Sequence, residues 1–139
     1  MSNLRTTLIT LVLGLIVFMA ADALWLGLIM KDVYQTKLGH LMAPTVTWWA
    51  VAMFYPFYTT GIYWFVVRPY LQNQSYRPTA LNGAFLGGLA YAAYDLTNQA
   101  TLLNWPIAIT VSDILWGSLV TTLTALAMKF ATLRLARHG

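Results

Sequence analysis

The sequence predicts an all-α fold, a polytopic membrane protein built as a bundle of four transmembrane helices. Of its 139 residues, 59% are hydrophobic and only 9% are charged. Soluble globular proteins average about 25% charged residues. Four long apolar blocks follow one another along the chain, with short polar segments between them. These observations exclude a water-soluble enzyme, and the length suits a single membrane domain covering residues 1–139.

The first predicted helix covers residues 8–30, a block with Asp22 as its single charge. Its length is close to the roughly 20 residues that cross a bilayer as a helix. A cleaved signal peptide ending near Ala23 is an alternative interpretation, because small residues surround that position. The apolar run continues to Met30 and is too long for a signal peptide, so we favour the transmembrane helix.

The second predicted helix, residues 44–67, has no charged residue and begins near Trp48 and Trp49, aromatic residues typical of a membrane interface. The third, residues 79–98, is shorter and more polar. Small side chains dominate its apolar positions, which is typical of a helix packed closely among others. These are Gly83, Ala84, Gly87, Gly88, Ala90, Ala92 and Ala93. The spacing of Gly83 and Gly87 predicts a close approach by another helix.

The fourth predicted helix covers residues 106–128. It begins with a proline, which suits the first turn of a helix, and Asp113 is its only charge. Lys129 follows directly and is expected to mark the end of the span.

The basic residues predict how the bundle is oriented. Six of the eight fall on one side of the four helices: Arg5, Arg68, Arg77, Lys129, Arg134 and Arg137. Lys31 and Lys37 fall on the other side. Because Lys and Arg accumulate in cytoplasmic segments, we expect a bacterial inner-membrane protein with both termini in the cytoplasm. The basic residues are dispersed between apolar blocks, so membrane lipids, and not nucleic acid, are the expected partners.

Three of the four acidic residues, Asp22, Asp95 and Asp113, lie inside predicted helices. At about 1.5 Å of rise per residue, all three fall in the outer half of the membrane. A charged residue within a bilayer costs about 2.5 to 3.5 kcal/mol or more, so each is a candidate functional residue. Every basic residue lies at a helix end or in a loop. The acids are therefore expected to be protonated and hydrogen-bonded, to line a wet cavity, or to bind a cation.

Polar and aromatic residues accompany these aspartates. On the third helix, Tyr91, Asp95 and Asn98 share one face, with Tyr94 and Thr97 flanking it. This grouping indicates that the polar residues form one site and are not isolated substitutions in the helices.

An Asp-x-Leu-Trp pattern occurs twice, at residues 22–25 of the first helix and 113–116 of the fourth. In each copy the tryptophan, Trp25 or Trp116, lies one turn from the carboxylate on the same face. We expect the indole to donate to that carboxylate or to wall off a pocket.

The candidate residues divide into two groups by chemistry. The candidate catalytic or metal-binding residues are Asp22, Asp95 and Asp113, and the candidate ligand-binding residues are Trp25, Tyr91, Tyr94, Thr97, Asn98 and Trp116. The aromatic residues of the second helix, including Tyr55 and Tyr58, are interpreted mainly as packing residues.

Residue counts exclude most cofactor chemistry. The chain has no cysteine, which excludes disulfides, iron–sulfur clusters and thiolate zinc sites. Its two histidines, His40 in a loop and His138 in the tail, cannot build a haem or zinc site within the helices. The sequence predicts no cofactor and leaves a divalent cation on the three carboxylates as an option. Whether the site is catalytic is left open.

Several stretches resemble a small bacterial family of predicted membrane proteins of unknown function. They are residues 90–102, which include Tyr-Asp-Leu-Thr-Asn, Trp105-Pro106, residues 113–117 (Asp-Ile-Leu-Trp-Gly) and residues 22–27, together with Tyr34, Leu38-Gly39 and Phe54-Tyr55. The resemblance implies a four-helix inner-membrane protein and no particular activity, cofactor or catalytic residue.

Three functional hypotheses follow. We favour a site, facing the outer leaflet, that binds or processes a small amphipathic molecule such as a lipid, a quinone or an isoprenoid. The first alternative is translocation of protons or cations. It needs a homo-oligomer, because the cytoplasmic halves of the helices have no ionisable residue. The second alternative is a structural or accessory membrane subunit, in which the acids only join helices.

Overall fold

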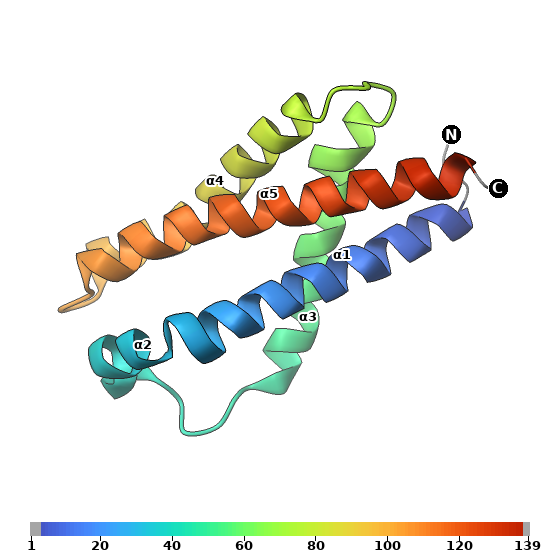
Figure 1. Cartoon of the computed structure of the whole chain (residues 1–139). Helices are drawn as coiled ribbons and strands as arrows, with labels where there is room; N and C mark the ends of the chain where they lie inside the picture. Colours follow the sequence, from blue (N-terminus) through green and yellow to red (C-terminus); the bar gives the residue numbers. More distant parts are fainter. Residues whose placement is uncertain (1–3, 138–139) are drawn as a thin grey trace.

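The computed structural model describes residues 4–137, and all regular structure in that range is helical (Figure 1), which confirms the all-α fold class. Four long helices carry the fold: α1 (Leu4–Leu24), α3 (Trp48–Ile62), α4 (Arg77–Thr101) and α5 (Ile107–Arg137). Shorter segments extend or connect them: the π-helical η1 (Trp25–Ile29), α2 (Lys31–Leu38), the 3-10 turn η2 (Gly39–Leu41), the π-helical η3 (Tyr63–Val67) and the 3-10 turn η4 (Arg68–Tyr70).

Three stretches of helix are long and apolar enough to cross a membrane by length and composition: Leu4–Ile29, Trp48–Tyr70 and Ile107–Ala136. The remaining long helix, α4, is more polar. It makes the most extensive helix–helix contact of the bundle, along α5. The prediction that the third helix is buried among the others is therefore confirmed only for the face that packs on α5, because α4 also exposes Leu81, Phe85 and Leu89.

The helices run so that α1 begins and α5 ends at the same end of the bundle, where η4 also leads into α4 (Figure 1). The short helix α2 and the connection from α4 to α5 lie at the opposite end. We call the first the basic end, because Arg5, Arg68, Arg77 and Arg134 belong to the helix ends that meet there. The other is the α2 end.

Glycines let α4 and α5 approach at backbone distance. A Cβ added at Gly87 would lie 2.0 Å from the carbonyl oxygen of Gly117, and one added at Gly83 would lie 3.0 Å from the Cα of Thr122. Since no side chain fits between the two backbones here, the predicted close approach at Gly83 and Gly87 is confirmed, with α5 as the partner.

The apolar core lies between α1, η3 and α5. It consists of Phe18, Ile62, Tyr63, Val66, Val67, Val120, Ala125 and Met128. α3 crosses the bundle steeply behind α1 and α5 (Figure 1). α4 packs against η3, the continuation of α3 near the basic end, and from there the two helices diverge towards the α2 end.

The last predicted helix end is wrong, because α5 continues past residue 128 to Arg137. Lys129 does not end the span at the surface and is fully buried, with 0% of its surface exposed. Its ammonium donates to the backbone carbonyl oxygens of Asn73 at 2.9 Å and Ser75 at 2.8 Å. A lysine whose donors are satisfied by carbonyl groups can lie inside a helix bundle, so its charge does not mark a boundary.

Two further differences concern the chain ends and connections. α1 already includes Leu4, before the predicted start at residue 8, and the segment after Met30 forms α2, a helix that hydropathy does not reveal. His138 lies outside the described residues.

The contact of α4 with α5 predicts the effect of a single methyl group. Gly87→Ala should lower the free energy of unfolding by about 1–3 kcal/mol, because the new Cβ meets backbone that cannot move aside. Gly61→Ala is the control, since no atom lies within 4 Å of a Cβ at that helical position. Thermal unfolding in detergent, followed by circular dichroism, measures both variants. Equal melting temperatures would contradict the contact.

Candidate functional site

Asp22 joins three helices through its carboxylate. The Trp116 indole N–H of α5 donates to its Oδ1 at 2.9 Å, and the Tyr55 hydroxyl of α3 donates to its Oδ2 at 2.9 Å. Only 6% of the Asp22 surface is exposed. Hydrogen bonds to a charged group contribute about 1.5–3 kcal/mol each. The two bonds therefore offset much of the free-energy cost of burying the carboxylate.

The two Asp-x-Leu-Trp segments meet across the contact between α1 and α5. The Trp25 and Trp116 rings stack, with centroids 4.6 Å apart and planes 2° from parallel. The expected donation from each indole to the aspartate of its own helix is wrong for both: Trp116 donates to Asp22 of α1, and the buried Trp25 N–H does not bond to Asp22.

Asp113 is bound from the α2 end. The hydroxyl of Tyr34, on α2, donates to its Oδ1. Burial, and then the adjacent Asp113 carboxylate, raise the pKa of Tyr34 well above its usual range. The phenol therefore keeps its proton at neutral pH and remains a donor, so that α2 is held over the end of the bundle through this bond.

Asp95 differs from the other two acids. Its side chain has no exposed surface, and neither carboxylate oxygen has a hydrogen-bond partner in the described part of the chain. The Trp105 indole lies beside it, with its own N–H unpartnered. Asp113 is within electrostatic range. The buried Asp95 carboxyl group therefore lacks the hydrogen bonds that would stabilise it in its charged form.

The three acids do not form one cluster. Asp22 and Asp113 interact electrostatically, as do Asp113 and Asp95, so the carboxylates form a row. Within residues 4–137, no group of three His, Cys, Asp or Glu side chains is close enough to hold a metal ion. None of the three acids is paired with a Lys or Arg there.

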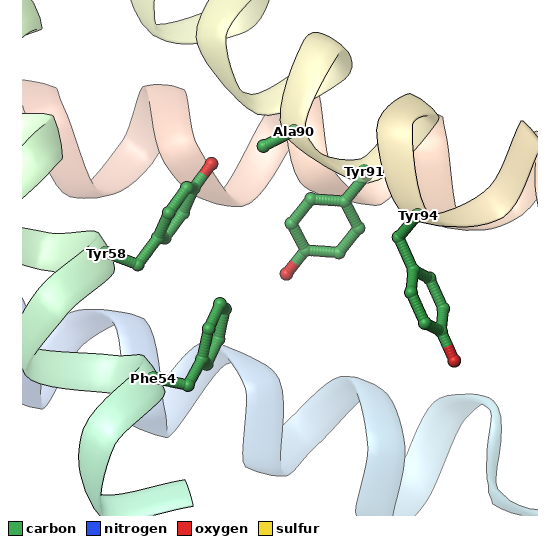
Figure 2. A pocket seen from close by; sticks show the side chains of 5 residues that line it. All are labelled: Phe54, Tyr58, Ala90, Tyr91 and Tyr94. Carbon is green, nitrogen blue, oxygen red and sulfur yellow. The ribbon is translucent and has the colours of Figure 1, made fainter. Parts of the chain in front are cut away.

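A cleft of about 350 Å³ lies between α3 and α4, and we call it the aromatic cleft. Its lining residues are Phe54 and Tyr58 from α3 and Ala90, Tyr91 and Tyr94 from α4 (Figure 2). The Tyr91 hydroxyl points across the cleft towards α3, whereas that of Tyr94 points away. The cleft lies where the two helices diverge (Figure 1).

The cleft is connected to the Asp22 network through Tyr91. This tyrosine lies within electrostatic range of the Asp22 carboxylate and of Tyr55 and Tyr58. Its ring packs on Gly117, where an added Cβ would lie 2.3 Å from the ring. Among the residues described, the Tyr91 hydroxyl has no hydrogen-bond partner. A polar group is therefore available at the inner wall of a mainly apolar cleft.

The remaining predicted residues are less central. Thr97 is exposed and donates to the carbonyl oxygens of Ala93 and Tyr94 on its own helix, at 2.5 and 2.9 Å. Asn98 is half-buried and interacts with Tyr94. The structure brings neither to the carboxylate of Asp22.

α3 and α2 contribute more to the site than the sequence patterns predict. Tyr55 binds Asp22, and Phe54 and Tyr58 line the aromatic cleft, so these aromatic residues do more than pack. Tyr34 was noted only through the family resemblance. One sequence signal could have identified these tyrosines: three acids within predicted helices, with every basic residue at a helix end or in a loop, require hydroxyl or indole donors from other helices.

Comparison with known proteins identifies the family. Residues 7–130 match a family described as "Predicted membrane protein (DUF2177)". The chain belongs to this family. No curated protein and no solved structure matches the DUF2177 chain. The family description establishes a membrane protein and assigns no activity, so the function has to be argued from the site.

The network predicts a specific loss of stability in this DUF2177 protein. Trp116→Phe keeps an aromatic ring against Trp25 but removes the N–H that binds Asp22. We expect the free energy of unfolding to fall by about 1–3 kcal/mol, the cost of leaving a buried acceptor unsatisfied. Trp48→Phe is the control, because 72% of the Trp48 surface is exposed. Denaturation by titrated sodium dodecyl sulfate compares them, and the same midpoint in both variants would contradict the bond.

Proposed function

We propose that this protein binds a small amphipathic molecule of the membrane, such as a lipid, a quinone or an isoprenoid, in the aromatic cleft between α3 and α4. The observation that carries the proposal is the cleft itself, with Tyr91 standing between it and the Asp22 network. Its volume of about 350 Å³ falls within the range of about 300–1,000 Å³ typical of small-molecule pockets.

The lining favours a flat or chain-like apolar molecule. Four of its five residues are aromatic, and aromatic rings offer large contact areas with little loss of side-chain entropy. Because the cleft lies between two helices that diverge, we expect a molecule dissolved in the bilayer to enter it from the side, without crossing water. This arrangement suits a ligand drawn from the membrane.

The polar end of the ligand should be uncharged. The Asp22 carboxylate lies close to Tyr91, and no basic side chain accompanies it, so an anionic headgroup would meet like charge. A carbonyl or hydroxyl oxygen would instead accept a hydrogen bond from the Tyr91 hydroxyl. These properties favour a quinone, an isoprenoid alcohol or a lipid with a neutral headgroup over an anionic phospholipid.

The alternative of translocation has less support. Between the Asp22 network and the basic end lies the apolar core, in which Phe18, Ile62 and Met128 have no exposed surface. A conducted proton or cation would have to pass these side chains. A purely structural role for the acids would explain the hydrogen bonds of Asp22. It would not explain why aromatic residues line an open cleft between α3 and α4.

The proposed location is the bacterial inner membrane, with the basic end in the cytoplasm. Six of the eight basic residues belong to the segments at that end, as the positive-inside rule requires of cytoplasmic segments. The aromatic cleft and the three acids then lie in the outer half of the membrane.

Filling the cleft tests the proposal without changing its chemistry. Ala90 is the small residue of the lining, so Ala90→Leu should exclude the ligand while the Asp22 network stays intact. Ala93→Leu is the matched control, because Ala93 lies one turn further along α4 and is exposed. Native mass spectrometry of protein purified in mild detergent, with extraction of bound quinones and isoprenoids, measures occupancy.

The expected result is one retained molecule in the wild type and in Ala93→Leu, and none in Ala90→Leu. A wild-type protein that retains nothing when quinone or isoprenoid alcohol is added would contradict the proposal. Equal retention by both variants would place the ligand elsewhere.

A further inference from the structure

The acidic residues of the chain are confined to one half of the bundle, whereas six of the eight basic residues belong to the other. All four acidic residues, Asp22, Asp32, Asp95 and Asp113, lie in the half towards the α2 end. The basic end therefore has several cations and no carboxylate to neutralise them within the described chain. No acidic side chain of the described residues reduces the positive electrostatic potential at this end, and such a potential attracts anions.

Lys129 places one of these cations inside the protein. The ammonium lies 5.0 Å from the centre of the Tyr76 ring, and its hydrogen bonds go to the neutral carbonyl groups of Asn73 and Ser75. These two carbonyl groups satisfy two of its three N–H donors and carry no negative charge to compensate the ammonium. The segment that joins η4 to α4 is thereby held against α5, with Tyr76 on the buried cation.

A second, smaller cleft of about 150 Å³ lies on the other side of this contact, lined by Tyr76, Phe130, Leu133 and Arg134. The Arg134 guanidinium stands over the Phe130 ring, with Cζ 5.1 Å from its centre. An arginine stacked on an aromatic ring has a restricted orientation, while the N–H groups at the edge of its guanidinium remain free to donate. Less side-chain entropy is therefore lost when it binds an anion.

We propose that this cleft, which we call the basic cleft, binds the phosphate group of an anionic ligand through Arg134, with Lys129 supplying further positive potential. Guanidinium groups match the paired oxygens of a phosphate. Phe130 and Leu133 offer an apolar surface beside it, as the first carbons of a lipid chain require. The phosphate can come from an anionic phospholipid or from a soluble phosphate compound, and the site is separate from the aromatic cleft.

The experiment compares Arg134→Gln with Arg68→Gln in the full chain. Arg68 belongs to the same end of the bundle but stacks on Trp64, 4.1 Å from the ring centre, outside the basic cleft. Each protein is reconstituted in phosphatidylcholine nanodiscs with increasing phosphatidylglycerol, and bound phosphatidylglycerol is followed by native mass spectrometry and by the unfolding temperature. A parallel titration uses inorganic phosphate in neutral detergent.

We expect Arg134→Gln to weaken the apparent affinity roughly tenfold, as for the loss of one charge-assisted hydrogen bond, while Arg68→Gln stays close to the wild type. Protection by phosphatidylglycerol alone identifies a lipid headgroup. Protection by inorganic phosphate, lost in Arg134→Gln, identifies a soluble source for the same site. Equal losses in the two variants, or no loss in Arg134→Gln, would overturn the proposal.

Discussion

A buried carboxylate needs either a basic partner or several hydrogen-bond donors, and within residues 4–137 none of Asp22, Asp95 and Asp113 is paired with a Lys or Arg. Asp22 therefore depends on donors from elsewhere, Trp116 on α5 and Tyr55 on α3. The two bonds fix the relative positions of three helices at one point. The stack of Trp25 on Trp116 depends on the same register of α1 against α5.

The position of α3 explains the aromatic cleft. α3 is held near its middle by the bond from Tyr55 to Asp22 and at its end by η3, which belongs to the apolar core. α4 follows α5 closely because glycines remove the side chains between them. Since α3 and α4 are bound to different partners, they diverge, and aromatic residues line the space between them. The aromatic cleft thus results from the same helix packing that brings hydrogen-bond donors to the buried Asp22 carboxylate.

Sequence patterns predicted the fold class, the long helices and the burial of Asp22, Asp95 and Asp113, because hydropathy and small-residue spacing are local properties. They could not predict the partner of each donor. Trp116 lies one turn from Asp113 and still binds Asp22, since packing between helices decides which acceptor it meets. The burial of Lys129 and the bond from Tyr34 to Asp113 also depend on contacts between distant segments.

Distances between spin labels test directly whether α3 and α4 diverge towards the α2 end. The chain has no cysteine, so pairs of introduced cysteines can be spin-labelled at exposed positions for electron paramagnetic resonance distance measurements in nanodiscs. One pair, Met53 and Leu96, reports on the α2 end, and another, Phe65 and Leu81, reports on the region near η3. The account predicts a clearly longer distance for the first pair. Equal distances would mean parallel, packed helices and would contradict it.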